Sequence, residues 1–361
     1  MSKDRSSNIE LLRIVAMLLI VLHHLCKYAY PGGSSIEIEI TRNVLLLGGK
    51  IGVDVFVLIS GYFLASGKIK ITSMLRVLFE AWFYSLTLGI ACANFVPDIF
   101  VVKDFLKSFL PTNNGLPWFV TAYLGMYLVA PWLSKLGNDL SGEQFKSLIL
   151  VGFCIFSLVP TLTGCMFVTG DFSWFCYLFL VACYIRRFEI TAPVSKMLCI
   201  GGLSFLVASV LVGELVCMKL PVFSRYVTYF ANMYTVPTLA GSVGLFCIFK
   251  ALKVPTIKPV NRIAQGAFGV YLIHENVFVR ELLWPNFGFV FAGSFLAEIL
   301  LAVLATLGIY ACLSCIDLIR QRLLETPFFK FLQSKLGLQF EKCDNALNGN
   351  VRERSNEQSR V

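Results

Sequence analysis

Long apolar runs recur along the whole chain and restrict its possible folds more than any other feature. Soluble domains carry about 25% charged residues, but here charged residues make up 15% and hydrophobic residues 57% of 361 residues. A helix needs roughly 20 apolar residues to cross a bilayer. The runs therefore predict an all-α polytopic membrane bundle of about ten transmembrane helices with no soluble domain. The expected spans are residues 9–28, 51–66, 75–96, 118–134, 147–165, 172–185, 197–217, 226–249, 263–283 and 288–319.

The distribution of basic residues predicts how these spans are oriented. Of the 31 Lys and Arg residues, 22 fall on the same side as the N-terminus and eight on the other. Since cytoplasmic loops are enriched in Lys and Arg, both termini are expected in the cytoplasm. The bias accounts for the net charge of +9 without a nucleic-acid partner. We expect a membrane domain over residues 1–340 and a polar, disordered cytoplasmic tail over 341–361.

The first span holds the densest set of ionisable residues, which are costly inside a membrane and mark functional sites by default. Arg13 and His24 are eleven residues apart, nearly three helical turns, so they share one face about 16 Å apart. Glu10 lies one turn from Arg13 and can pair with it. His23 is rotated about 80° from this face. In the alternative interpretation, Arg13 extends to the cytoplasmic surface and His24 caps the outer end of the helix.

Two further polar residues are expected at the depth of His24. His274 lies in the outer half of the ninth span with Tyr271 one turn away, and Asp54 begins the second span at the outer side. A carboxylate can orient a histidine that acts as a general base on a hydroxyl group, so Asp54 is predicted to orient His24. No HxxxH or HExxH spacing is present, so no metal is expected.

Other catalytic motifs have little support. Ser60 lacks the GxSxG context of a nucleophilic serine, and there is no Walker loop or GxGxxG. Most of the 12 Cys lie inside apolar runs, where they are small buried hydrophobic residues rather than disulfide partners.

Several segments together resemble the integral-membrane acyltransferase-3 family, bacterial proteins that O-acylate surface polysaccharides and other glycans. The similarity begins with Arg13 and His24, which match the family's Arg, ten residues, His signature. It continues through nearly the whole chain in the same order. The other similar segments are GVDVFVLISGYFL at 52–64, PWFVTAYLGMYLVAPWL at 117–133, Arg186 and Arg187, VPTLAGSVGLFCIF at 236–249, and GVYLIHEN at 269–276.

The resemblance implies a membrane O-acyltransferase of the bacterial cytoplasmic membrane. Its donor would be acyl-CoA, most often acetyl-CoA. Its acceptor would be a sugar hydroxyl of a surface or capsular polysaccharide or of the lipid-linked precursor. Many relatives carry an added esterase-like domain that is not expected here, so the glycan, like the oligomeric state, is left open. The rival interpretations are a transporter or flippase for a lipid-linked glycan, which places polar residues at bilayer depth without catalysis, and a membrane sensor.

The resemblance assigns the catalytic roles, and the chemistry of acyl transfer from CoA suggests the binding roles. The catalytic residues would be His24, Asp54, His274 and Arg13. Arg13, Arg186 and Arg187 would bind the donor phosphates, although ordinary anchoring by positive charge explains Arg186 and Arg187 equally well. Trp118, Tyr271 and Glu275 would bind the acceptor, with an interfacial belt as the alternative for Trp118.

Overall fold

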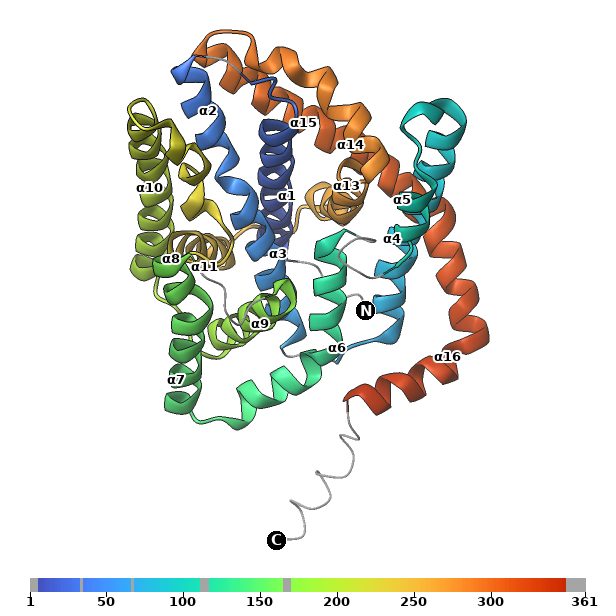
Figure 1. Ribbon diagram of the computed structural model, residues 1–361. Helices are drawn as coiled ribbons and strands as arrows, with labels where there is room; N and C mark the ends of the chain where they lie inside the picture. The colour runs from blue at the N-terminus through green and yellow to red at the C-terminus, as the bar shows by residue number, and fades with distance from the viewer. Residues whose placement is uncertain (1–5, 33–34, 66–67, 111–116, 165–169, 349–361) are drawn as a thin grey trace.

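The computed structural model describes residues 6–32, 35–65, 68–110, 117–164 and 170–348, and every regular element in these ranges is helical. Within these ranges, seven helical segments are long and apolar enough to cross a membrane. The prediction of an all-α polytopic membrane bundle is therefore confirmed (Figure 1). The α-helices are α1 (Ser7–Tyr28), α2 (Ile36–Leu46), α3 (Gly48–Leu64), α4 (Ile71–Phe95), α5 (Val102–Lys107), α6 (Trp118–Asp139), α7 (Gly142–Phe153), α8 (Val159–Thr163), α9 (Asp171–Arg187), α10 (Ala192–Cys217), α11 (Val236–Ala251), α12 (Lys258–Ile263), α13 (Ala267–His274), α14 (Val277–Leu283), α15 (Phe295–Arg320) and α16 (Thr326–Asn348).

Three of the ten predicted spans are not among the seven segments. They correspond to α6, to the 17-residue α9, and to the region of α12, α13 and α14, where short helices replace one continuous span. Helix α9 buries nine of its residues against its neighbours. A helix enclosed by other helices can be shorter than the bilayer or broken, because protein rather than lipid surrounds its ends. The count of ten spans therefore stays a prediction.

Helix α1 lies at the centre of the view in Figure 1 and packs closely against α3. Glycines in α3 make the close approach possible, because small residues let helix backbones meet. A Cβ added at Gly52 would lie 2.5 Å from the Ala16 carbonyl oxygen, and one at Gly49 would lie 2.3 Å from the His23 ring. The two helices are antiparallel, so later residues of α3 lie beside earlier residues of α1.

The second membrane segment begins earlier than the sequence predicts. Residues 36–46, expected to be part of a connection, form α2, which leads directly into α3 and makes one segment from Ile36 to Leu64. Residues near the start of the predicted span therefore lie deeper in the bundle than expected, which matters for Asp54 below.

The polar end of the chain also differs from its predicted boundary. Helix α16 continues to Asn348, so residues 341–348 are helical rather than part of a disordered tail. The Asn348 amide nitrogen donates to the Ile69 carbonyl, and the Asp344 carboxylate accepts from the Ile71 N–H at 2.7 Å. These bonds fasten the end of α16 to the start of α4. Residues 349–361 lie outside the described ranges.

Helix α13 is held against α15 at a glycine. A Cβ added at Gly269 would lie 2.1 Å from Asp317 Cγ. Asp317 cannot move away easily, because it is fully buried and accepts hydrogen bonds from Tyr84 Oη at 2.8 Å and Arg320 Nε at 2.7 Å. The backbones of α13 and α15 can approach this closely only because residue 269 has no side chain.

We expect Gly269→Ala to lower the thermal stability of the purified protein, since overpacking of a closely packed site costs about 1–3 kcal/mol. Gly308→Ala in α15 is the matched control, because a Cβ there meets nothing within 4 Å. Alanine at position 308 should leave the melting temperature unchanged or raise it slightly, since alanine is favoured over glycine inside helices by about 0.5–1 kcal/mol. Equal melting temperatures for the two variants would contradict this account of the α13 and α15 contact.

Candidate functional site

Two histidines that are 250 residues apart in the sequence meet inside the bundle. His24 Nδ1, in the last turns of α1, lies 2.9 Å from His274 Nε2 at the C-terminal end of α13. His274 is fully buried. His23 turns to a different neighbour, and its Nδ1 lies 2.8 Å from the Leu46 carbonyl oxygen. The structure thus brings His24, and not His23, to His274.

The surrounding hydrogen bonds determine where the two rings carry their protons. His274 Nδ1 lies 2.6 Å from the Val270 carbonyl oxygen, which can only accept, so this nitrogen is protonated. In the neutral ring His274 Nε2 is then an acceptor, and His24 Nδ1 must donate to it. His24 Nε2 is therefore left with a lone pair that no described residue engages, which is what a general base requires.

Glu275 lies beside the same nitrogen of His24 as a charged neighbour, without a hydrogen bond to it. Its Oε2 lies 3.3 Å from His24 Nδ1, and its Oε1 accepts a hydrogen bond from Tyr28 Oη at 3.2 Å. Arg280 Nη1 lies 3.7 Å from Oε1. The Tyr28 ring stacks on His24, with centroids 5.6 Å apart. The negative charge of a carboxylate this close stabilises the protonated form of the His24 ring.

Glu275 lies beside His24 because helix α13 ends at the preceding residue. Helix α13 ends at His274, and the Asn276 side chain accepts a hydrogen bond from the Phe278 N–H at the start of α14. Glu275 is the connecting residue. An Asn cap at a helix start is a recognisable sequence signal, and the sequence His274, Glu275, Asn276 contains it.

Ligand atoms of His24, His274 and Glu275 all lie within 4.8 Å of one another, so the same cluster could hold a metal ion. Two nitrogens bound to a tetrahedral zinc at 2.0–2.1 Å are about 3.4 Å apart. The histidine nitrogens are 2.9 Å apart, a hydrogen-bond distance. The geometry of this pair fits a shared proton better than a metal.

Asp54 does not orient His24, contrary to the prediction. Its Oδ1 accepts a hydrogen bond from Trp174 Nε1 at 2.9 Å, and its Oδ2 lies 3.5 Å from Ser242 Oγ. The antiparallel register explains the difference, because Gly49 lies beside His23 while Gly52 lies beside Ala16. Asp54 is therefore at a level of α1 about two turns away from His24. It joins α3 to α9 and α11 in the fully buried core.

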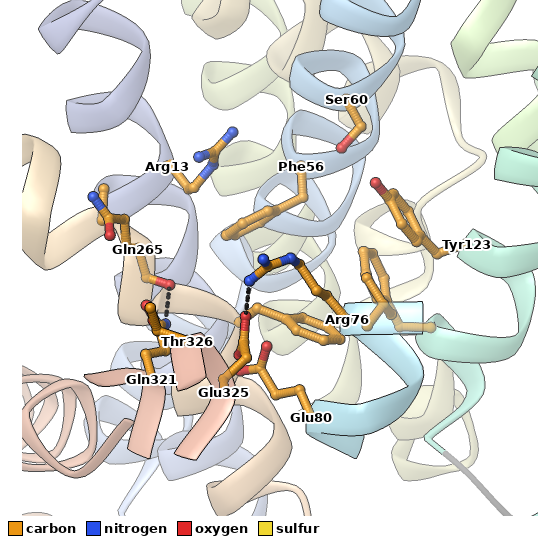
Figure 2. Close-up of a pocket in the computed structure, with 14 residues that line it drawn as sticks. Arg13, Phe56, Ser60, Arg76, Glu80, Tyr123, Gln265, Gln321, Glu325 and Thr326 are labelled. Atoms are coloured by element: carbon orange, nitrogen blue, oxygen red, sulfur yellow. Dashed lines mark hydrogen bonds and ion pairs between the residues drawn. The ribbon is translucent and has the colours of Figure 1, made fainter. Parts of the chain in front are cut away.

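Arg13 lines a cavity of 530 Å³ at the other end of α1. The predicted pair with Glu10 is confirmed, with Arg13 Nη1 3.0 Å from Glu10 Oε2. Figure 2 shows Arg76 pointing to Glu325 across the cavity, with Nη1 2.8 Å from Oε1. Ser60 also lines the cavity beside the aromatic ring of Tyr123. We call this space the Arg13 cavity.

The cavity and the histidine pair are separated by aromatic rings. Phe119 lines the cavity and contacts Tyr271, with ring centroids 5.7 Å apart. Tyr271 in turn lies 6.0 Å from the His274 ring. Tyr271 thus stands between the Arg13 cavity and the histidine pair.

The structure does not bring Arg186 and Arg187 to this cavity. Arg186 Nη1 donates to the Tyr62 carbonyl at 2.9 Å near the end of α3. Arg187 Nη1 donates to the carbonyls of Gly137 and Leu140 near the end of α6. Neither is among the described residues that line the Arg13 cavity. Their basic groups bind the unpaired carbonyls of helix C-termini, a common use of arginine.

Trp118 begins α6, and the Lys50 ammonium lies 4.7 Å from its ring centroid. Sequence reasoning missed Lys50, although it stands only four residues before Asp54. It follows Gly49, which contacts His23, so it lies at about the depth of the histidines. Tyr28 and Arg280 were missed as well, and only their helical spacing from His24 and Glu275 could have indicated them.

Fold and site together define a polytopic membrane protein with a paired-histidine centre inside its bundle. The chain belongs to the acyltransferase-3 family, whose model, described as an acyltransferase domain, matches residues 6–314. The protein is accordingly an acyltransferase. No curated protein and no solved structure matches the chain.

Proposed function

We propose that the protein transfers an acyl group, acetyl in the simplest case, from acyl-CoA to a hydroxyl group of a glycan. The observation that carries this proposal is the free lone pair of His24 Nε2, which follows from the hydrogen bonds of His274 to Val270 and His24. A base of this kind is what a sugar hydroxyl requires before it can attack a thioester.

In the proposed reaction, His24 Nε2 removes the proton of the acceptor hydroxyl as its oxygen attacks the thioester carbonyl. The tetrahedral intermediate collapses, the carbon–sulfur bond breaks, and the proton on His24 passes to the departing CoA thiolate. Glu275 stabilises the imidazolium between these steps. Tyr271, between the Arg13 cavity and His274, is suited to donate a hydrogen bond to the developing oxyanion.

The two ends of α1 suggest that the donor and the acceptor approach from opposite faces of the membrane. Arg13 and His24 lie about 16 Å apart along the helix, and the excess of Lys and Arg favours a cytoplasmic location for the Arg13 end. Acyl-CoA would enter the Arg13 cavity from the cytoplasm, with both termini of the chain on that side. The acceptor, a surface or capsular polysaccharide or its lipid-linked precursor, would meet Trp118 and Lys50 at the outer end, in the bacterial cytoplasmic membrane.

Chemical analysis of O-acetyl groups on surface polysaccharide, with and without this protein, tests the proposal. We expect an ester-linked acetyl group that disappears with the gene and returns when the gene is restored. Purified protein in sealed, oriented vesicles should transfer label from acetyl-CoA supplied at the Arg13 face. Acetyl-CoA supplied only at the His24 face should give no product.

A flippase for a lipid-linked glycan would give a different outcome. It would move labelled glycan lipid between leaflets in the absence of acyl-CoA and leave O-acetylation unchanged when removed. Movement of the glycan lipid together with unchanged O-acetylation would overturn the acyl-transfer proposal for this chain.

A further inference from the structure

A second cavity adjoins the Arg13 cavity. It measures 480 Å³, and its lining includes Arg262 and Arg322. Three side chains line both cavities, and Figure 2 draws them close together at one side of the Arg13 cavity: Gln265, Gln321 and Thr326. The two cavities therefore meet at these residues. We call the second one the Arg322 cavity.

The charges of the two cavities differ. Around the Arg13 cavity each arginine has a carboxylate partner, because Arg13 pairs with Glu10 at 3.0 Å and Arg76 with Glu325 at 2.8 Å. Arg262 and Arg322 are exposed, and neither forms an ion pair with any residue that the structure describes. The uncompensated positive charge thus lies in the Arg322 cavity.

The elements that carry these two arginines are fastened together. Arg262 lies in α12, and Arg322 lies in the π-helical turn Gln321–Glu325 between α15 and α16. Gln321 Nε2 donates to the Gln265 carbonyl at 3.1 Å and to Asp317 Oδ2 at 2.7 Å. The backbone segments that carry both arginines are thereby held together, which lowers the entropy lost when a ligand binds.

We propose that Arg262 and Arg322 bind the phosphates at the nucleotide end of acyl-CoA, above all the 3′-phosphate of its ribose. The inference rests on the proposed acyl-CoA donor and adds a place for its nucleotide. CoA is anionic only at this end, while its pantetheine arm and thioester are neutral. The charged end matches the uncompensated arginines, and the neutral arm matches the charge-compensated Arg13 cavity. Arginine binds phosphate through paired N–H donors, which makes such contacts strong.

Two donors that differ only at this phosphate provide the test. Acetyl-CoA and 3′-dephospho-acetyl-CoA are compared with purified protein in vesicles, and apparent KM and kcat are measured for each. We expect Arg322→Ala and Arg262→Ala to raise the KM for acetyl-CoA by about 10- to 100-fold, the usual effect of losing a hydrogen bond to a charged group. The KM for the dephospho donor should change little, and kcat should remain near that of the wild type.

Lys253→Ala serves as the control, because Lys253 is also an exposed basic residue but does not line the Arg322 cavity. It should leave both KM values unchanged. Arg322→Gln and Arg262→Gln, checked by their melting temperatures, repeat the test with side chains that retain hydrogen-bond donors but no charge.

The outcomes separate this inference from the proposed function. If the wild type transfers acetyl groups from acetyl-CoA but the variants still distinguish the two donors as the wild type does, the nucleotide site is elsewhere and the inference is wrong. An equal rise of KM for both donors would overturn the assignment to the 3′-phosphate. If the wild type uses neither donor, the proposed function itself fails.

Discussion

Replacing His24 with alanine is expected to lower the rate of acyl transfer by about 10²- to 10⁴-fold, the usual contribution of a general base. Its Nε2 holds the only lone pair in the described histidine pair that is free to accept a proton, because His274 Nε2 accepts from His24 and His274 Nδ1 donates to Val270. The apparent KM for the donor should change little, since His24 does not line the Arg13 cavity. Transfer of labelled acetyl groups by purified protein measures both quantities.

His23→Ala is the matched control on the neighbouring residue. His23 binds the Leu46 carbonyl and packs against Gly49, so its loss affects the contact between α1 and α3 rather than the histidine pair. Most of the activity should remain once the folded fraction has been taken into account. Similar mild losses for the two variants would show that His24 is not the base.

The meeting of His24 and His274 could be anticipated from the sequence, because both rings were expected in the outer halves of their apolar runs. The contact between the Glu275 carboxylate and His24 could not be anticipated in this way. Asp54 looked suitable because the second run begins at residue 51, but α2 extends that segment back to Ile36 and places Asp54 two turns deeper. Glu275 is adjacent to His274 in sequence, and its contact with His24 depends on the end of α13, which hydropathy does not reveal.

Hydropathy predicted the seven long apolar segments, but it does not distinguish a helix that faces lipid from one that is surrounded by protein. The cores of a bundle and of a bilayer both select apolar residues, so the composition of α9 and α13 does not tell whether they cross the membrane. The Arg13 cavity was beyond sequence reasoning for another reason. Its lining comes from helices far apart in the chain. The partners of Arg186 and Arg187 could not be predicted either, because the helix-end carbonyls that bind them come close only in the folded protein.

Truncation of Arg320 is expected to give the largest loss of stability. Its side chain is 3% exposed, and its guanidinium group contacts Asp317 at 2.7 Å, Glu325 at 2.8 Å and Glu80 at 3.2 Å. Removing one partner of a buried ion pair costs about 3–5 kcal/mol because the remaining charge is left uncompensated. Arg320→Ala leaves Asp317 and Glu80 in this condition, while Glu325 keeps Arg76 as its partner, so we expect a large fall in melting temperature or a loss of monodisperse protein.

The same arginine has a second effect, because Glu80 and Glu325 both line the Arg13 cavity. With Arg320 in place their negative charge is balanced, and the wall of the cavity does not repel an anionic donor. Arg320→Lys keeps the charge, but one ammonium group cannot reach three carboxylates. We therefore expect a folded protein with a lower melting temperature and a higher KM for acetyl-CoA.

Arg322→Ala is the control, two residues away and exposed. It should alter the melting temperature little, since it changes a surface residue without an ion-pair partner among the described residues. Thermal unfolding of the three variants in one detergent would decide the matter, and an Arg320→Ala protein as stable as the wild type would show that this cluster does not hold α4, α15 and α16 together.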